Sequence, residues 1–306
     1  MLNLLVREKL TGNNWVSPKT LLLGGSGFLG SYFLKYANNL KGKRIDEVNS
    51  NWITGHHEKF ENKDSLISFL KKYSFQRVIN CIALADIEKC DSNPKLAYWL
   101  NAEIPSIVSD YCNLVGASMT HISTDAVFDG ESSFRKESDI PNPISVYGKT
   151  KKAGEDLVLQ NSVNALIARV NFYGFSKREK TLFNFFYKRM VSNTLTPAFE
   201  DVFFTPMFAG DTVETIVELH KINAQGIYHV VGNERISKFE FACRISDVFN
   251  YPKDWIIRTK VPENLTLNLR GQDLSLARDA LDRLGFRESL INEGLNKLKV
   301  EIKGKD

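Results

Sequence analysis

The stretch LLLGGSGFLGSYFLKY, residues 21–36, most strongly constrains the fold of this 306-residue chain. A short, wholly apolar run is typical of a strand that is buried on both faces of a parallel sheet. The glycines that follow predict a tight turn, and the apolar residues after them recur at helical spacing. Strand, glycine turn and helix in this order open the units that bind dinucleotides. The stretch therefore predicts an α/β fold whose first turn holds a pyrophosphate.

The glycines of this turn have the spacing G-x-x-G-x-x-G. Gly24 lets the chain turn sharply out of the strand, Gly27 lets a pyrophosphate approach the backbone, and Gly30 lets the helix pack closely on the sheet. The helix N-terminus adds free N–H groups and a partial positive charge. We therefore expect cofactor contacts from the whole turn, namely from Gly24, Ser26, Gly27, Phe28, Leu29 and Gly30.

Strand-like and helix-like patterns alternate as far as residue 174. Further strands are expected around residues 45–51, 77–84, 117–124 and 164–174. This alternation predicts a Rossmann-type, doubly wound parallel sheet. We expect an NAD(P)-binding domain over residues 20–174, completed by residues 205–231. Residues 175–204 and 232–306 are expected to form a smaller α+β lobe that binds the substrate, and residues 1–19 an N-terminal extension.

The choice of cofactor depends on the end of the second strand, where an acidic residue would bind the ribose of NAD. In this sequence Asn49, Ser50 and Asn51 stand at the expected place, and none of them is charged. A 2′-phosphate would not be repelled there, so NADP(H) is favoured, with NAD(H) as the alternative. Lys43, Arg44 and His56 are candidate partners for that phosphate, although a solvated surface is the simpler interpretation.

Tyr147 and Lys151 are spaced to share one face of a helix, about one turn apart. An ammonium beside a tyrosine is expected to lower the phenol pKa from about 10, which would make Tyr147 a usable acid for a nascent alkoxide. Lys151 can also hold the ribose of a nicotinamide. Thr124 ends a predicted strand at the sheet edge where ligands bind, and its hydroxyl can donate to a carbonyl oxygen. A local backbone hydrogen bond is the alternative role for that hydroxyl.

Together these residues resemble the extended short-chain dehydrogenase/reductase superfamily and, more narrowly, the dTDP-4-dehydrorhamnose reductase family of sugar-nucleotide reductases. The specific stretches are GGSGFLG (24–30), VINCIALADIEKCDSNPKLAYWLNAEIP (78–105), HISTDAVFDG (121–130) and PNPISVYGKTKKAGE (141–155). FFTPMFAGD, GIYHVVGNERISKFEFA and LRGQDLSLARDAL carry a softer similarity. The resemblance implies reduction of a nucleotide-activated 4-keto-sugar in carbohydrate biosynthesis, with hydride from the nicotinamide and a proton from tyrosine.

The resemblance also assigns individual residues. It implies Thr124, Tyr147 and Lys151 as the catalytic set, with Tyr147 and Lys151 also on the cofactor. Further cofactor contacts are implied at Phe60, Glu61, Ala83 and Leu84, and substrate contacts at Thr124, Asp125, Asn171 and Phe172. The sequence departs from the family at Ala126, where a tyrosine is usual, at Glu61, where an aspartate is usual, and at Gly271 after Arg270, where a proline is usual.

Two alternative functions stay open. A sugar-nucleotide epimerase would use the same cofactor and catalytic set. A dehydratase would need an Asp-Glu pair after Thr124, and here Asp125 is followed by Ala126. A non-catalytic, NADP-binding regulatory protein is the second alternative, because the family has relatives that resemble a regulatory subunit of methionine adenosyltransferase.

The composition argues against several other classes. The net charge is +4 without a concentrated basic stripe, so no nucleic-acid partner is expected. The four cysteines include no C-x-x-C pair, and adjacent His56 and His57 suit chelation poorly, so neither a disulfide scaffold nor a metal site is expected. We find neither a run of about 18 apolar residues nor a secretory signal. We expect a cytoplasmic protein without membrane contact, with a homodimer as the candidate assembly.

Overall fold

The computed structural model describes residues 19–39, 52–55, 60–162, 164–176, 181–262 and 271–303. Most of the predicted N-terminal extension, residues 1–18, lies outside the described residues. The same is true of several residues named in the sequence analysis: Lys43, Arg44, Asn49, Ser50, Asn51, His56, His57 and Arg270.

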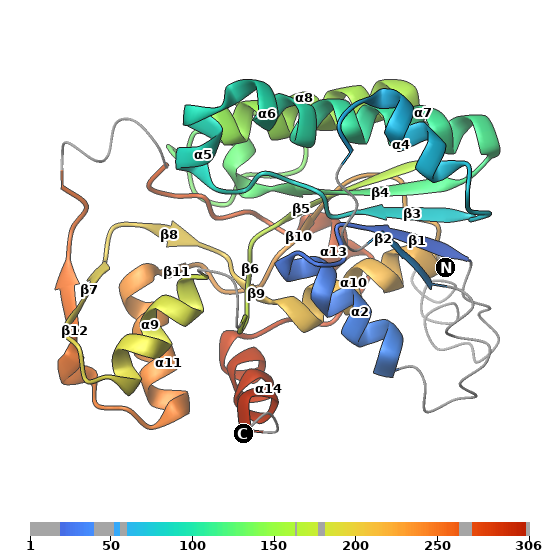
Figure 1. Ribbon diagram of the computed structural model, residues 1–306. Coiled ribbons are helices and arrows are strands. Elements are labelled where there is room, and N and C mark those ends of the chain that lie inside the picture. Colours follow the sequence, from blue (N-terminus) through green and yellow to red (C-terminus); the bar gives the residue numbers. More distant parts are fainter. Residues whose placement is uncertain are drawn as a thin grey trace.

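A six-stranded parallel sheet forms the centre of the molecule (Figure 1). Its strands are β1 (Thr20–Leu23), β2 (Trp52–Gly55), β3 (Arg77–Asn80), β4 (Ser118–Thr124), β5 (Ala165–Val170) and β10 (Gly226–Val230). Their spatial order is β10-β5-β4-β3-β1-β2, with all five pairings parallel. The chain winds one way from β1 to β2 and the other way from β3 onward, so the predicted doubly wound Rossmann-type fold is confirmed.

Helices cover both faces of the sheet (Figure 1). On one face lie α4 (Lys63–Leu70), α5 (Ile87–Ser92), α6 (Pro94–Tyr98), the π-helix η2 (Trp99–Glu103), α7 (Ile104–Val115) and α8 (Val146–Asn161). On the other lie α2 (Phe28–Asn39) and α10 (Ala209–Lys221). Each face has its own apolar core, and adjacent residues of β1 divide between them: Leu22 belongs to one and Leu21 and Leu23 to the other. The continuous apolar run is therefore explained by burial on both sides.

Side-chain caps fix the ends of the helices that matter for the site. Ser145 accepts a hydrogen bond from the Gly148 amide and so begins α8. Asn62 and Ser65 form a reciprocal capping box at the start of α4. Gly116 follows the last residue of α7 and has a φ of 71°, as expected for a glycine that ends a helix.

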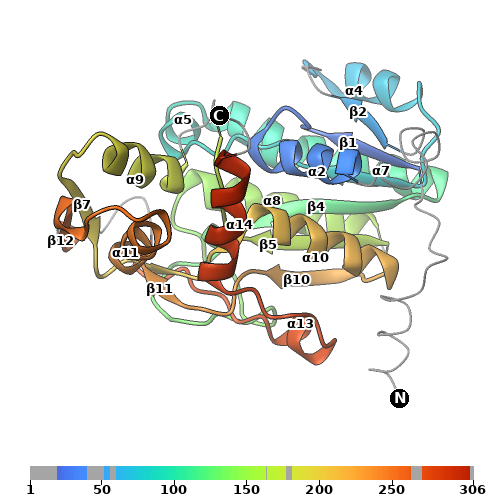
Figure 2. The same cartoon turned by 90° about the horizontal axis from the view of Figure 1, so that it is seen from below.

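A second lobe lies beside the sheet (Figures 1 and 2). It contains α9 (Leu182–Val191), α11 (Lys238–Phe249) and three short strand pairs: β7 (Thr196–Phe199) with β12 (Ile256–Thr259), β8 (Phe203–Phe204) with β11 (Ile236–Ser237), and β6 (Phe172–Tyr173) with β9 (Met207–Phe208). The remaining elements are the 3-10 helices η3 (Asp125–Val127) and η4 (Lys253–Trp255), and the helices α13 (Asp279–Arg283) and α14 (Ile291–Lys303). Because β10 returns to the main sheet after this lobe has begun, the lobe is built from separated parts of the chain.

The second strand of the sheet does not lie where the sequence predicted it. The strand that pairs with β1 is β2, at residues 52–55, whereas residues 45–51 lie outside the described residues. Because the strand runs on to Gly55, Asn49, Ser50 and Asn51 do not end it. The reason for favouring NADP(H) that was taken from these three residues is therefore wrong.

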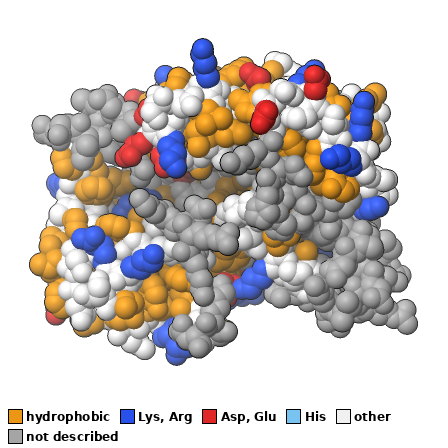
Figure 3. Space-filling view, viewed as in Figure 1, with side chains coloured by type: hydrophobic (Ala, Val, Ile, Leu, Met, Phe, Trp, Pro, Cys, Tyr) orange, Lys and Arg blue, Asp and Glu red, His pale blue; other side chains and the backbone are white. Residues whose placement is uncertain are grey.

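The described residues contain no helix long and apolar enough to cross a membrane. In the same part of the chain, no group of three His, Cys, Asp or Glu side chains could hold a metal ion. On the face seen in Figure 3, basic and acidic side chains lie close to one another over the upper layer of helices.

Candidate active site

The glycine turn has the close approaches that its spacing predicts. Gly24 has a φ of 76°, and a Cβ there would lie 2.8 Å from the amide nitrogen of Ile82. A Cβ on Gly30 would lie 2.2 Å from the Gly24 carbonyl oxygen. The Gly27 amide donates to that same oxygen, and Ser26 is exposed just before α2. The first turn of α2 thus presents free N–H groups to an open surface, which fits a pyrophosphate.

An aromatic pair joins this turn to the lobe. The ring of Phe28 lies 5.4 Å from the ring of Phe172, measured between centroids. A Cβ on Gly174 would lie 3.1 Å from the Phe28 ring and 2.6 Å from the Tyr32 hydroxyl. Phe28, a predicted cofactor contact, therefore packs against Phe172, a predicted substrate contact. Leu29, the next residue after Phe28, is buried in the core.

The loop after β3 is held by a buried asparagine. Asn101, in η2, accepts from the Leu84 amide at 2.8 Å and donates to the Leu84 carbonyl at 3.1 Å. The same side chain donates to Thr150 of α8 at 3.0 Å. Gly154 permits this contact, because a Cβ there would lie 2.1 Å from the Asn101 carbonyl oxygen. The loop that carries exposed Ala83 and half-buried Leu84 is thus fixed to the catalytic helix.

Phe60 and Glu61 differ in their surroundings. The Phe60 ring is buried against Phe69 at 5.2 Å, and its carbonyl accepts from the Trp99 indole at 3.0 Å. Glu61 is exposed at the start of α4. Because the Phe60 ring belongs to the core, a contact with a cofactor would come from its backbone. The implied cofactor roles of both residues stay predictions.

Thr124 and Asp125 lie at the carboxyl end of β4. The Thr124 hydroxyl donates to Asp125 Oδ1 at 2.9 Å and accepts from the Ala126 amide, which caps η3. The Asn171 side chain donates to the other carboxylate oxygen of Asp125. Burial raises the pKa of Asp125, while the hydrogen bonds from Asn171 and Thr124 and the charge of Lys238 oppose the rise. Three of the four predicted substrate residues, Thr124, Asp125 and Asn171, are thereby brought together. The Thr124 hydroxyl also has the local backbone hydrogen bond that was its alternative role in the sequence analysis.

Tyr147 lies beside Thr124, at the start of α8. Burial raises the pKa of Tyr147, a hydrogen bond with Thr124 opposes this, and the charges of Asp125 and Cys90 add to the rise. The prediction that Lys151 lowers this pKa is wrong for the protein alone, because burial dominates and Lys151 binds elsewhere. Tyr147 is therefore a neutral phenol that holds its proton.

Lys151 is directed into the sheet instead. Its side chain is 1% exposed, and Nζ donates to the Ile122 carbonyl at 2.6 Å and lies 3.2 Å from Nε2 of His121. Burial lowers the pKa of Lys151 to about 8, and the charge of Glu155 opposes this. The neutral amine is therefore accessible near neutral pH.

The hydrogen-bond roles around His121 favour that neutral amine. The Ile82 amide donates to Asn80 Oδ1 at 3.1 Å, so the Asn80 nitrogen faces Nδ1 of His121 at 3.2 Å and donates to it. Burial lowers the pKa of His121 well below its ordinary value, so the ring is neutral and carries its hydrogen on Nε2. Only an amine with a free lone pair can accept from that hydrogen, and an ammonium cannot.

The sequence analysis missed the residues that support this site. Asn80 and His121 stood within the quoted stretches but had no assigned role, and their pairing depends on β3 and β4 being neighbours. Asn101 was missed in the same way. From the lobe, Lys238 lies over the Phe204 ring at 3.2 Å, and its charge reaches Asp125. No spacing in the sequence connects Lys238 with Asp125.

Comparisons with known proteins show which proteins the chain is similar to. The sequence profile of the RmlD substrate binding domain matches residues 18–278. A probable low-salt glycan biosynthesis reductase of Haloferax volcanii, Agl14, is 31% identical over 74% of this chain and 78% of its own. Methionine adenosyltransferase 2 subunit beta of Bos taurus is 30% identical over 71% of each chain. The crystal structure of dTDP-4-dehydrorhamnose reductase from Bacillus anthracis, in complex with NADP, superposes with a TM-score of 0.83 at 23% identity, covering 93% of this chain and 99% of that one.

Proposed function

The chain belongs to the RmlD substrate binding domain family, and on that premise we propose that it is an NADPH-dependent reductase of a nucleotide-activated 4-keto-sugar. One observation carries the proposal: Thr124 and Tyr147 interact at the carboxyl edge of β4, one helical turn from buried Lys151. The names of two similar proteins, one a glycan biosynthesis reductase and one a dTDP-4-dehydrorhamnose reductase with NADP, support the same reaction class.

The residues present fit a dinucleotide. The turn at Gly24, Gly27 and Gly30 would hold the pyrophosphate: side chains at Gly24 and Gly30 would collide with backbone, and a Cβ at Gly27 would lie 3.3 Å from the Gly24 carbonyl oxygen. Leu84, fixed by Asn101, would border the nicotinamide half, and Lys151 would hold its ribose. When bound, the reduced nicotinamide supplies the hydride. NADP(H) is the favoured cofactor because the Bacillus anthracis reductase binds NADP, and NAD(H) stays the alternative.

The chain's own residues would then manage the proton. Tyr147, with its raised pKa, would remain protonated until negative charge develops on the substrate oxygen, and would donate its proton at that point. The Thr124 hydroxyl would exchange its bond with Asp125 for one with the same oxygen. Asn171 would keep Asp125 in place while Thr124 turns. The charge of Lys238 would add to the hydrogen bonds that oppose the rise that burial causes in the pKa of Asp125.

A non-catalytic, regulatory role is the second candidate, and one comparison favours it. The methionine adenosyltransferase 2 subunit beta of Bos taurus is a subunit by name and is as similar to this chain as the reductase relative is. An epimerase that uses the same residues is a further alternative.

One experiment separates these functions. Purified protein and NADPH are incubated with a panel of nucleotide 4-keto-sugars while the absorbance of reduced nicotinamide is followed. The reductase oxidises NADPH in step with the loss of keto-sugar. Cofactor binding without oxidation across the panel supports the regulatory role, and an isomerised sugar with no net cofactor consumption supports the epimerase.

A further inference from the structure

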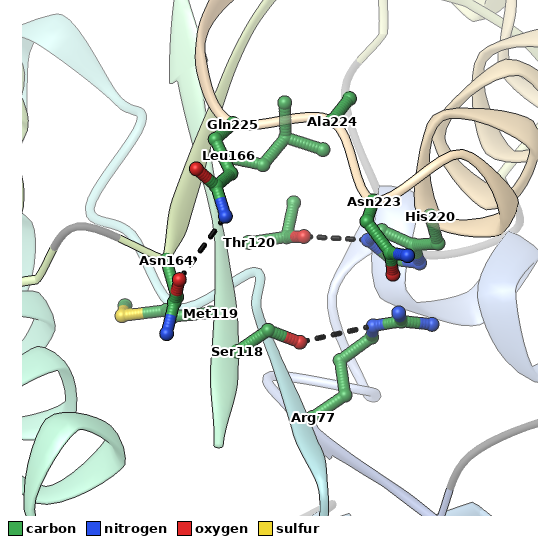
Figure 4. Close-up of a pocket in the computed structure, with 10 residues that line it drawn as sticks. All are labelled: Arg77, Ser118, Met119, Thr120, Asn164, Leu166, His220, Asn223, Ala224 and Gln225. Carbon is green, nitrogen blue, oxygen red and sulfur yellow. Dashed lines mark hydrogen bonds between the residues drawn. The ribbon is translucent and has the colours of Figure 1, made fainter. Parts of the chain in front are cut away.

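A cavity of about 230 Å³ lies at the opposite edge of the sheet from Thr124 and Tyr147 (Figure 4). Its walls come from the first residues of β3 and β4, from the start of β5 and from the loop between α10 and β10. No residue of the proposed reductase site lines it. Any ligand of this cavity would therefore be distinct from the cofactor and the sugar.

One wall of the cavity carries a cation, Arg77, that forms no ion pair with a carboxylate of the described residues. Arg77 is 8% exposed, and its Nε donates to the Ser118 hydroxyl at 3.3 Å. Within the part of the chain that the structure describes, neither terminal nitrogen of this guanidinium has a hydrogen-bond partner, and no carboxylate forms an ion pair with it. Burial lowers the pKa of Arg77 to about 10, so it stays charged at neutral pH. The terminal nitrogens of Arg77 are not among the fully buried, unpartnered side-chain atoms of the described residues, so they face the open space of the cavity, where an anion could reach them.

The side chains around Arg77 are uncharged, and several of them can donate hydrogen bonds. Figure 4 shows the Arg77 side chain extending past Ser118 towards the side of the cavity formed by His220 and Asn223. Ser118 accepts from Arg77, so its own hydrogen is free to donate. Among the described lining residues there is no Asp or Glu. The side-chain amide of Asn223 adds donors from the loop side.

His220 is a neutral side chain beside Arg77. Its Nε2 lies 2.6 Å from the Thr120 hydroxyl. Burial and, after it, the charge of Arg77 hold the pKa of His220 well below its ordinary value. His220 is therefore uncharged at neutral pH and does not add a second positive charge to the cavity.

We propose that this cavity binds a small tetrahedral oxyanion, with the terminal nitrogens of Arg77 as its main contact and Ser118 and Asn223 as further donors. A guanidinium binds a phosphate-type anion through two parallel hydrogen bonds, and donors from the loop side suit an anion whose oxygens point in several directions. The anion is either free phosphate or the phosphoryl group of a small phosphomonoester. The site is independent of the proposed reductase function.

The test is thermal unfolding with increasing inorganic phosphate, with chloride added to keep the ionic strength constant. NADP⁺ is kept saturating, so that phosphate does not occupy the cofactor turn. The melting temperature of the wild type rises with phosphate, because a ligand that binds only the folded state stabilises it. Titration calorimetry with phosphate, and in parallel with glycerol phosphate, gives the affinities and shows which of the two sources binds more tightly.

Two variants make the test specific. Arg77→Met is as stable as the wild type, or more stable, without phosphate, and binds phosphate at least about tenfold more weakly, as expected when charge-assisted bonds are lost. Asn223→Asp supplies a carboxylate to Arg77 and suits the left-handed backbone there, whose φ is 53°. It is therefore more stable without phosphate and no longer responds to it.

Lys95→Gln is the matched control, because it removes an exposed cation from α6 instead. It responds to phosphate like the wild type. The proposal is overturned if the wild type shows no saturable response, or if Arg77→Met and the wild type respond equally. All variants keep the NADPH oxidation of the wild type, so a failed phosphate response and a failed reductase proposal are told apart.

Discussion

Nζ of Lys151 lies 3.2 Å from Nε2 of His121 and 2.6 Å from the Ile122 carbonyl oxygen of the same strand. Asn80 fixes the tautomer of this histidine, and the histidine in turn favours an uncharged amine. In the protein alone, the Lys151 amine that the i, i+4 spacing places on the same helix face as Tyr147 is thus bound to His121 and Ile122. Its protonation can be measured without knowing the substrate.

The stability of the protein should depend on pH through Lys151. Its pKa in the folded protein is about 8, below the ordinary 10.5, so the unfolded chain binds more protons between these values. The free energy of unfolding of the wild type should therefore rise relative to Lys151→Met as the pH increases from about 8 to 10.5, by on the order of 3 kcal/mol. Urea unfolding of both proteins across this range measures the difference. A difference that stays flat with pH would show that Lys151 is an ordinary ammonium.

Replacing His121 should raise the pKa of Lys151. In His121→Phe the neutral amine loses the hydrogen bond that it accepts, so its charged form becomes relatively more favourable. The pH-dependent rise in stability should then begin at a higher pH and become smaller. Met119→Leu is a control on the same strand, because Met119 packs in the apolar core. If the pH dependence of the free energy of unfolding is the same in His121→Phe as in the wild type, His121 does not set the pKa of Lys151.

Asn101→Leu should weaken cofactor binding by about tenfold. The substitution leaves the Leu84 amide and carbonyl without the side chain that fixes them, so the loop beside the proposed nicotinamide site loosens. Fluorescence titration with NADPH measures the affinity. Thr150→Val removes only one of the Asn101 bonds and should have a smaller effect. Equal NADPH affinities in wild type and Asn101→Leu would count against this loop as a cofactor contact.

Gly24→Ala should abolish NADPH binding or prevent folding, whereas Gly116→Ala should do neither. Both glycines have a positive φ, but a Cβ on Gly24 meets the backbone at Cys81 and Ile82, and one on Gly116 meets nothing within 4 Å. Gly116→Ala should therefore cost only the left-handed strain of about 1–2 kcal/mol. Chemical unfolding and NADPH titration of both variants check this contrast. Similar losses in the two variants would mean that backbone strain, and not the close approach, decides the requirement for glycine.

The fold class was predictable because β1 and β5 are short, mostly apolar runs and helical patterns lie between the predicted strands. The position of β2 was missed although Trp52, Ile53 and Thr54 favour a strand, because a run of four residues is too short to show a period and its pairing with β1 decides it. The core position of Phe60 was missed for a similar reason: an aromatic residue before a helix reads the same whether it packs inward or faces a ligand. The partners of Lys151 could not be predicted either, because Asn80 and His121 meet only through the order of β3 and β4.

The central claim is that Tyr147 protonates a substrate that receives hydride from NADPH. The most direct measurement uses NADPH deuterated at the transferable position and follows the nucleotide-sugar by mass spectrometry. The wild type should place one deuterium on the reduced sugar carbon, and Tyr147→Phe should bind NADPH equally well while losing at least about a hundredfold in rate, the contribution of a general acid. NADPH that binds the wild type but passes no deuterium to any 4-keto-sugar of the panel, or equal transfer by Tyr147→Phe, would contradict the account.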